Sequence, residues 1–255
     1  MYKLNREFPQ QVPVIRTISP DDEMLAPAAY GEEQYFSVGA SALENILAAL
    51  AIAGRASVES ILDLPCGHGR VTRYLRAAFP RANICACDTN RDGVDFCVAQ
   101  FGVEPFYSSP EFKDVHLNET FDMIWSGSLF THLNRERFEE CFDFYIDHLS
   151  DNGVLVFSVH GRYSTWLQHH GFKYLPDERF EQIMQGYEQA GFGYADYNYD
   201  YYADEVGYGI SITKPSWIAS MIERNEAIRL LFFKERAWLG HHDIVACVKT
   251  PIFDG

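Results

Sequence analysis

The central part of the chain, residues 58–159, alternates short apolar runs with segments of helical periodicity. Each apolar run is too short for a buried helix and has no polar face, which is typical of a strand covered on both sides. The helical segments between the runs are long enough to cross from one strand to a parallel neighbour. This alternation predicts βαβ units and therefore a parallel sheet with helices on its faces.

The predicted strands and helices follow one another in a regular order. The strands cover residues 60–64, 83–88, 121–125 and 154–159, and the helices cover residues 41–53, 71–79, 93–100 and 135–149. Near the C-terminus, a helix at 215–225 precedes two strands at 228–238 and 243–249. The connection between these two strands is so short that they can pair only as an antiparallel hairpin.

The first predicted strand leads into a glycine turn, Pro65-Cys-Gly-His-Gly69. Gly67 and Gly69 lack a Cβ, so the backbone can approach a ligand closely, and the next helix begins with free N–H groups. Asp88 ends the second strand, where a carboxylate can accept hydrogen bonds from both hydroxyls of a ribose. The pattern favours an adenosine-containing cofactor over the alternative, an ordinary loop of an α/β protein.

Two cofactor classes use this arrangement. The dinucleotide fingerprint G-x-G-x-x-G needs a third glycine at position 72, which is Thr72. An acidic residue at the end of the first strand, Asp63, repels a pyrophosphate and attracts an ammonium group. An ammonium, a carboxylate and an adenosine together describe S-adenosylmethionine, and a nicotinamide dinucleotide remains the alternative.

The same segments resemble the class I S-adenosylmethionine-dependent methyltransferases over residues 40–160 and 215–250. Asp63-Leu-Pro-Cys-Gly-His-Gly-Arg70 is similar to motif I of that family, with Pro65 in place of the usual first glycine. Residues 121–133 resemble the motif IV strand and its following segment, and residues 149–157 resemble the Pro-Gly-Gly turn motif, here Asp-Asn-Gly.

This resemblance implies a doubly wound, seven-stranded, mostly parallel sheet with an antiparallel C-terminal strand. It implies transfer of a methyl group from S-adenosylmethionine to an oxygen or nitrogen of a small molecule or glycan, with S-adenosylhomocysteine as product. The cofactor contacts that it implies are Asp63, Pro65, Gly67, Gly69, Asp88, Thr89, Ser108, Ser126 and Gly127. Tyr35-Phe-Ser-Val-Gly39 resembles the segment that folds over the methionine end, although Tyr35 and Phe36 can equally be core residues.

Two histidines are candidate general bases because each follows a predicted strand at the edge where ligands bind. His160 is favoured and His132 is the second candidate, against the alternatives of a structural histidine or a helix cap. The adjacent pairs His169-His170 and His241-His242 lack the spacing of metal ligands, so the sequence predicts no metal site.

Residues 162–213 have no place in the minimal fold of this family. They include a predicted helix at 177–190, a tyrosine-rich stretch at 194–202 and a predicted strand at 207–213. We expect an N-terminal segment (1–57), a core (58–161 and 214–255) and an inserted cap (162–213) over the active site. The tyrosines form either a wall for a sugar or phenol, or a stiffened exposed hairpin.

Composition narrows the partners and the compartment. The formal net charge of −15, from 21 Lys and Arg against 36 Asp and Glu, disfavours a nucleic acid as acceptor. The chain has no uninterrupted apolar run of membrane-spanning length, and its first residues do not resemble a signal peptide. Six scattered cysteines predict reduced, buried thiols in the cytoplasm. The alternatives to a methyltransferase are an NAD-dependent oxidoreductase and a non-catalytic S-adenosylmethionine-binding protein.

Overall fold

A seven-stranded sheet forms the centre of the protein in a computed structural model that describes residues 13–25, 31–197 and 207–250. The strand order is β3-β2-β1-β4-β5-β9-β8. The bounds are β1 Ser60–Asp63, β2 Asn83–Asp88, β3 Glu104–Tyr107, β4 Phe121–Ser126, β5 Leu149–Val159, β8 Ile228–Trp238 and β9 His242–Lys249. The five strands β1 to β5 pair in parallel, whereas β9 runs antiparallel to both β5 and β8.

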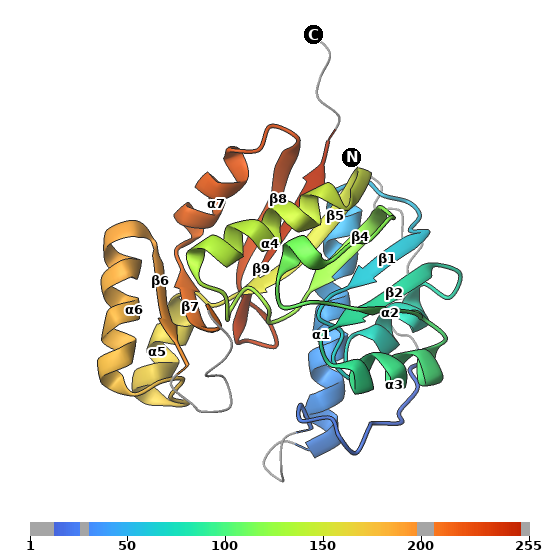
Figure 1. Ribbon diagram of the computed structural model, residues 1–255, viewed down its shortest axis with the longest axis horizontal. Helices are drawn as coiled ribbons and strands as arrows, with labels where there is room; N and C mark the ends of the chain where they lie inside the picture. Colours follow the sequence, from blue (N-terminus) through green and yellow to red (C-terminus); the bar gives the residue numbers. More distant parts are fainter. Residues whose placement is uncertain (1–12, 26–30, 198–206, 251–255) are drawn as a thin grey trace.

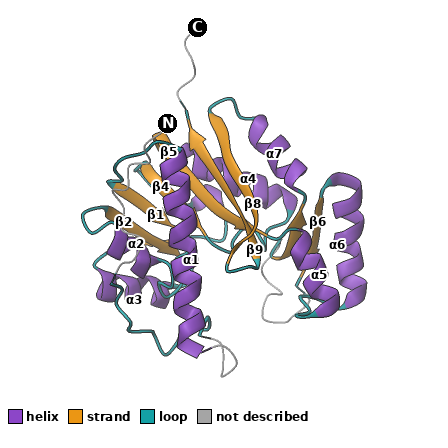
Figure 2. Ribbon diagram, turned by 180° about the vertical axis from the view of Figure 1, so that it is seen from behind, coloured by secondary structure: helices purple, strands orange, loops and turns teal. Residues whose placement is uncertain are grey.

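Helices cover both faces of this sheet, as Figures 1 and 2 show from opposite sides. One face packs against α1 Gly31–Ile52, α2 Thr72–Ala78 and α3 Arg91–Phe101. The other face packs against α4 Arg135–Asp147, α7 Pro215–Glu223 and the short 3₁₀ helix η1 Phe112–Asp114. The prediction of a doubly wound, mostly parallel seven-stranded sheet with an antiparallel C-terminal strand is confirmed.

Residues 162–197 and 207–213 form a separate lobe beside the sheet, drawn in yellow to orange in Figure 1. Its elements are α5 Arg162–His170, α6 Asp177–Ala190 and the antiparallel pair β6 Phe192–Asp196 and β7 Gly209–Thr213. The lobe has an apolar cluster of its own, which includes Phe180, Ile183 and Ile212. Strand β7 is joined to the core because the Ser211 N–H donates to the Thr131 carbonyl (2.9 Å).

Some elements differ from the sequence prediction. The first helix begins at Gly31 rather than at residue 41, so Tyr35 and Phe36 lie inside it and are buried. Strand β3 and helix α5 were not predicted, whereas β6 overlaps the start of the hairpin that was one of two alternatives for residues 194–202. Strand β3 is an edge strand with mostly exposed side chains and a proline, so it has no apolar run to reveal it. The sequence of α5, RYSTWLQHH, likewise has no sustained apolar stripe.

The predicted turn at Asp151-Asn-Gly153 lies inside a longer strand. Strand β5 already begins at Leu149, and Asn152 has a φ of 60°. The pairing of β4 with β5 shifts between Phe121 and Met123. The turn residues therefore produce an irregularity that bends the strand rather than a boundary that ends it.

Helix α1 is long and apolar enough to cross a membrane by length and composition alone, with a mean hydropathy of 1.4 over its most apolar window. Half of that window (50 %) is buried inside the structure. The buried face includes Leu43, Ile46 and Leu50, which belong to the core beneath α1. All six cysteines lie in the described residues, where they are buried and form no disulfide.

Candidate functional site

The strand order reverses between β1 and β4, and open α/β sheets bind ligands at the carboxyl ends of the strands at such a point. Asp63, Asp88 and Ser126 are the last residues of β1, β2 and β4, so they share this edge. Because β9 is antiparallel, its first residue, His242, lies at the same edge. We call this edge of the sheet the carboxyl edge.

The glycine turn follows β1 directly and is held to β2. The Cys66 N–H donates to the Cys87 carbonyl (3.0 Å), and the Leu64–Pro65 peptide is cis. Gly67 and Gly69 both have positive φ, at 50° and 78°. A Cβ on Gly69 would strike the ring of Phe101 at 2.4 Å, whereas a Cβ on Gly67 would meet none of the described residues within 4 Å. Position 69 therefore requires a glycine because Phe101 packs against it, whereas the space next to Gly67 at the turn is open.

Asp63 is 1 % exposed, and only one of its two carboxylate oxygens has a hydrogen-bond partner among the described residues. Its Oδ2 accepts a hydrogen bond from the Thr72 hydroxyl (2.6 Å), while Oδ1 is buried without a hydrogen-bond partner among the described residues. Burial raises the pKa of Asp63 to about 7, with the nearby Asp88 adding to the rise and the Thr72 hydroxyl opposing it. An unpartnered buried carboxylate oxygen is costly, and a cation would offset that cost.

Asp88 links the second strand to the glycine turn. Its Oδ2 accepts from the Gly67 N–H (2.7 Å) and its Oδ1 accepts from the Asn90 N–H (2.9 Å). The Thr89 hydroxyl is 3.5 Å from Oδ1, and Thr89 itself is exposed. A carboxylate has about four lone-pair sites, so acceptor capacity remains for two hydroxyls of a ribose. The hydrogen bond to Gly67, which shapes the turn, was not predicted.

The remaining predicted cofactor contacts lie at the ends of β3 and β4. Ser108 is half-buried and donates its backbone N–H to the Asp88 carbonyl (2.8 Å). Ser126 is fully buried, and its hydroxyl oxygen accepts from the Tyr145 hydroxyl (2.9 Å) on the α4 side of the sheet. Gly127 packs against Trp238, whose ring a Cβ would approach to 2.8 Å. The side chain of Ser126 therefore lies on the opposite sheet face from that of Asp63.

Tyr35 is a hydrogen-bonded core residue. Of the two roles predicted for it, the core and the segment over the methionine end of the cofactor, this is the former. Its hydroxyl donates to Asp22 Oδ2 (2.6 Å), and the buried Arg73 donates to the same hydroxyl oxygen (3.2 Å). Arg73 also donates to the carbonyls of Ile15 and Thr17, both at 2.9 Å. Residues 13–25 are therefore fastened against α1 and α2.

Arg70 ends the motif at residues 63–70 and was not among the predicted cofactor contacts. It follows the glycine turn, and its guanidinium carbon is 6.0 Å from the ring centres of both Tyr35 and Trp238. Burial lowers its pKa, and Tyr35 and Asp22 oppose that change. A guanidinium keeps its charge even so, and it suits a carboxylate in the bidentate geometry of such pairs.

The two candidate bases meet at the carboxyl edge, with ring centres 6.5 Å apart. Nδ1 of His132 is 2.9 Å from the Gly209 carbonyl oxygen, which can only accept, so Nδ1 carries the proton and Nε2 the lone pair. Burial lowers the pKa of His132, partly offset by that carbonyl. His132 does not cap α4, because Asn134 does so by accepting from the Arg137 N–H (3.0 Å).

His160 is 3 % exposed, and its Nδ1 has no hydrogen-bond partner in the described part of the chain. Burial holds its pKa well below 6.5, and His132 and His241 lower it further. The pair His241-His242 packs against His160, with ring centres at 5.8 and 4.7 Å. Nothing in the spacing of these segments along the sequence indicates that they meet.

The lobe meets the carboxyl edge through two tyrosines. Tyr208 stacks on the ring of His132 (centroids 5.0 Å apart), and the Tyr197 hydroxyl is 3.1 Å from His132 Nδ1. The rest of the predicted tyrosine-rich stretch, residues 198–202, lies outside the described residues. Aromatic faces therefore border one of the two candidate bases.

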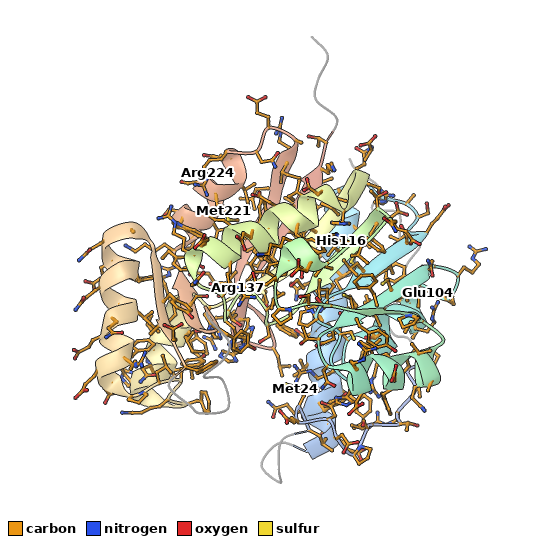
Figure 3. All side chains as sticks on the ribbon, viewed as in Figure 1. Met24, Glu104, His116, Arg137, Met221 and Arg224 are labelled. Carbon is orange, nitrogen blue, oxygen red and sulfur yellow. The ribbon has the colours of Figure 1, made fainter. Side chains whose placement is uncertain are left out.

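A cavity of about 350 Å³ lies elsewhere, between α4 and α7. Met221 of α7 and Arg224, the residue after α7, line it and are labelled in Figure 3, and Glu139 and Phe142 line it from α4. None of the predicted site residues contributes to this cavity.

Three features of the carboxyl edge match three polar groups of S-adenosylmethionine. The unpartnered oxygen of Asp63 suits its ammonium, Arg70 suits its carboxylate, and Asp88 suits its ribose. A pyrophosphate fits poorly, because the buried carboxyl of Asp63 lies beside the turn and Thr72 donates to that acid.

Comparisons with known proteins agree with this geometry. The family described as "Methyltransferase domain" matches residues 62–155. A malonyl-[acyl-carrier protein] O-methyltransferase of Bacillus anthracis is 30 % identical over 156 residues, which are 60 % of this chain and 56 % of that protein. The chain thus spans about half the length of the curated relatives it matches.

Solved structures share the fold at low sequence identity. CalS10, an amino pentose methyltransferase of Micromonospora echinaspora, has a TM-score of 0.57 at 14 % identity, over 86 % of this chain and 96 % of that one. An S-adenosylmethionine-dependent methyltransferase of Clostridium acetobutylicum has a TM-score of 0.56 at 15 % identity, over 90 % and 96 %. In its glycine turn, its sheet order and these likenesses, the chain is similar to the class I S-adenosylmethionine-dependent methyltransferases.

Proposed function

We propose that this protein transfers the methyl group of S-adenosylmethionine to an oxygen or nitrogen of a small-molecule or glycan acceptor. The observation that carries the proposal is the unpartnered Oδ1 of Asp63, buried where β1 leads into the glycine turn. In such a reaction the sulfonium of the donor supplies the electrophilic methyl group. The chain's own residues hold the donor, orient the acceptor and take up a proton.

His132 is the better placed of the two candidate bases. The Gly209 carbonyl fixes its tautomer with the lone pair on Nε2, and its lowered pKa keeps the ring neutral at pH 7. A neutral imidazole can accept the proton that an acceptor hydroxyl or ammonium loses. The rings of Tyr197 and Tyr208 border it with aromatic surface, which supports a sugar or phenol as acceptor.

A second acceptor class rests on the curated relatives. Those relatives are malonyl-[acyl-carrier protein] O-methyltransferases, and the alignment with one of them reaches 30 % identity over 60 % of this chain. In that case the acceptor oxygen belongs to a malonyl group on a carrier protein. A carboxylate is already deprotonated at neutral pH, so this acceptor would not need His132 as a base.

The test is a methyl-transfer assay that detects S-adenosylhomocysteine by mass spectrometry. Acceptors are phenols, amino sugars and malonyl-acyl-carrier protein, each tested with the wild type and with Asp63→Asn. We expect turnover with one acceptor class and donor binding about 10–100-fold weaker in Asp63→Asn. Binding of S-adenosylhomocysteine without transfer to any acceptor would instead favour a non-catalytic binding protein. Binding of NAD(H) but not S-adenosylhomocysteine would favour an oxidoreductase.

A further inference from the structure

Three histidines from two distant segments converge at the carboxyl edge. His160 follows β5, and His241 and His242 lie where the β8–β9 turn enters β9. The antiparallel register pairs Val159 with Asp243, so the ends of the two segments lie side by side. The ring centres of His241 and His242 are 4.4 Å apart, and those of His160 and His242 are 4.7 Å apart.

One ring nitrogen from each of these histidines lies within 4.8 Å of the other two. A tetrahedral zinc ion with Zn–N bonds of about 2.0–2.1 Å requires nitrogens roughly 3.3 Å apart. The cluster must therefore contract by roughly 1.5 Å at most to hold such an ion. His241 is half-buried in a turn, so its side chain can supply much of that movement.

An orphaned nitrogen is the independent sign of a ligand. Nδ1 of His160 is buried and has no hydrogen-bond partner among the described residues, and the whole side chain is 3 % exposed. A buried imidazole nitrogen without a partner forfeits the hydrogen bond that it would make in water. A metal ion bound by that nitrogen removes this cost.

The other two histidines have polar partners that hold their rings. The Tyr174 hydroxyl contacts Nε2 of His241, and the Ser158 hydroxyl oxygen is 3.2 Å from Nδ1 of His242. Metal-ligating histidines commonly use their second nitrogen in this way, which sets the ring orientation and tautomer. Ser158 is itself fixed, because it accepts the Ser128 N–H at 2.8 Å.

We propose that His160, His241 and His242 form a binding site for a divalent transition-metal ion, with Zn²⁺ as its first candidate. Imidazole donors suit Zn²⁺ and other late transition metals rather than Mg²⁺ or Ca²⁺. Burial lowers the pKa of all three rings, so they are neutral and able to ligate at pH 7. Three protein ligands leave one position of a tetrahedral ion open to water or another oxygen donor.

The proposal does not rest on the proposed function, since metal binding is measured without a methyl donor. It also assigns different roles to the two histidines that the sequence offered as bases. His160 becomes a metal ligand, and His132, whose Nδ1 is engaged with the Gly209 carbonyl, remains the candidate base.

The experiment titrates chelator-treated protein at pH 7.5 with Co²⁺, followed by visible absorption, and with Zn²⁺, followed by calorimetry. We expect one equivalent of each metal and the intense visible bands of tetrahedral Co²⁺. His241→Ala should weaken binding at least 10-fold, and Tyr174→Phe should weaken it about 10-fold, as loss of an outer partner does. His116→Ala, at an exposed histidine after η1 (Figure 3), should bind like the wild type.

The variants distinguish this site from adventitious surface binding. No binding by the wild type, or equal loss in His116→Ala and His241→Ala, would overturn the proposal. His241→Gln repeats the test with a side chain that preserves volume in case the alanine variant is unstable. Calorimetry with S-adenosylhomocysteine on each variant checks the fold and shows separately whether donor binding fails.

Discussion

At the scale of single residues, burial moves two ionisable groups of the site in opposite directions. It raises the pKa of Asp63 and lowers that of His132. Each shift favours the neutral form, since burial penalises charge of either sign. Asp63 is therefore poised to become charged when a cation arrives, and His132 is poised to accept a proton.

Donor binding should strengthen as the pH rises through about 7, the pKa to which burial raises Asp63. An ammonium favours the carboxylate, so below that pH binding must first release the proton of the acid. Affinity for S-adenosylhomocysteine should fall up to 10-fold per pH unit below 7. Calorimetry at pH 6 in buffers of different ionisation enthalpy should show proton release. Asp63→Asn should bind about 10–100-fold more weakly and without this pH dependence.

Replacement of His132 should lower turnover and leave donor binding unchanged. His132→Asn keeps a donor for the Gly209 carbonyl but removes the basic nitrogen, so kcat should fall about 100-fold or more with a hydroxyl or amine acceptor. Tyr197→Phe, which leaves the imidazole in place, is the matched control. Full activity of His132→Asn would show that the acceptor reacts without this base, as a carboxylate would.

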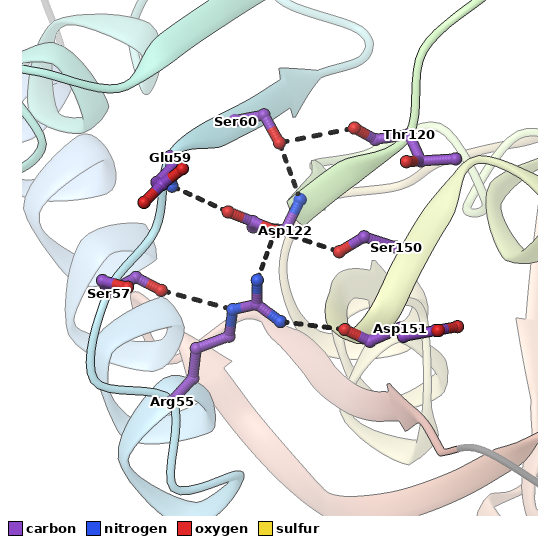
Figure 4. A network of polar contacts seen from close by, with 8 residues as sticks. All are labelled: Arg55, Ser57, Glu59, Ser60, Thr120, Asp122, Ser150 and Asp151. Carbon is purple, nitrogen blue, oxygen red and sulfur yellow. Dashed lines mark hydrogen bonds and ion pairs between the residues drawn. The ribbon is translucent and has the colours of Figure 1, made fainter.

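At the scale of elements, the two ends of the parallel strands hold different groups of residues. The carboxyl edge holds the site, and the opposite edge holds the polar network of Figure 4 around Asp122. This carboxylate accepts from the Glu59 N–H (2.8 Å), the Ser150 hydroxyl (3.0 Å) and the guanidinium of Arg55. The network joins the segment before β1 to β4 and β5.

Asp122→Asn should lower the free energy of unfolding by about 1–3 kcal/mol, because three hydrogen bonds, one of them from the half-buried Arg55 guanidinium, lose their anionic acceptor. Burial acts to raise the pKa of Asp122, but the Glu59 N–H, Ser150 and Arg55 together hold it below 3.8. A lowered pKa stabilises the folded state above about 3.8, and that contribution is lost as the pH falls through the lowered value. Urea unfolding at pH 7 and pH 3 should therefore show a smaller difference between the two proteins at pH 3.

Gly93 in the first turn of α3 packs against the glycine turn, so Gly93→Ala should weaken donor binding. A Cβ there would lie 2.6 Å from the Gly67 carbonyl oxygen, which is backbone and cannot move alone. We expect at least a 10-fold loss in affinity for S-adenosylhomocysteine. Gly102→Ala, at the other end of α3, meets no described atom within 4 Å and strains only its φ of 61°. It should cost about 1 kcal/mol of stability and leave affinity unchanged.

At the scale of the whole molecule, the lobe is fastened to the core at the site itself. The N–H groups of Gly209 and Thr213 donate to the carbonyls of His132 (2.7 Å) and His160 (2.9 Å). The two candidate bases of the core are therefore bonded through their own backbones to β7 of the lobe. Movement of the lobe would therefore change the positions of both histidines.

Hydrogen exchange should show β7 opening together with the core sheet. The amides of Gly209, Ser211 and Thr213 should exchange as slowly as those of β5, because their hydrogen-bond partners lie in the core and the side chains of β7 are buried. Amides of α5, residues 162–170, are the comparison, since most of that helix is not buried. Fast exchange of β7 alongside slow exchange of β5 would show a lobe that opens independently.

The sequence predicts most of the fold because the information is local. The strand ending at Asp88 and the helix at 177–190 have the bounds expected from periodicity, since apolar spacing follows directly from backbone geometry. The start of α1 was not predicted because Gly31 and the acidic residues after it give no apolar helical pattern before Tyr35 and Phe36. Strand β3 was missed because an exposed edge strand has no apolar signature.

The sequence alone determined the glycine turn and the acids at the ends of β1 and β2, because chain direction in parallel strands places such residues at one edge. Only the tertiary structure decided which histidines meet. His160 and the pair His241-His242 become neighbours because β9 runs antiparallel to β5, and no local spacing records that pairing. The tertiary structure also decided the tautomer of His132, because the Gly209 carbonyl that determines it belongs to the lobe and is distant in sequence.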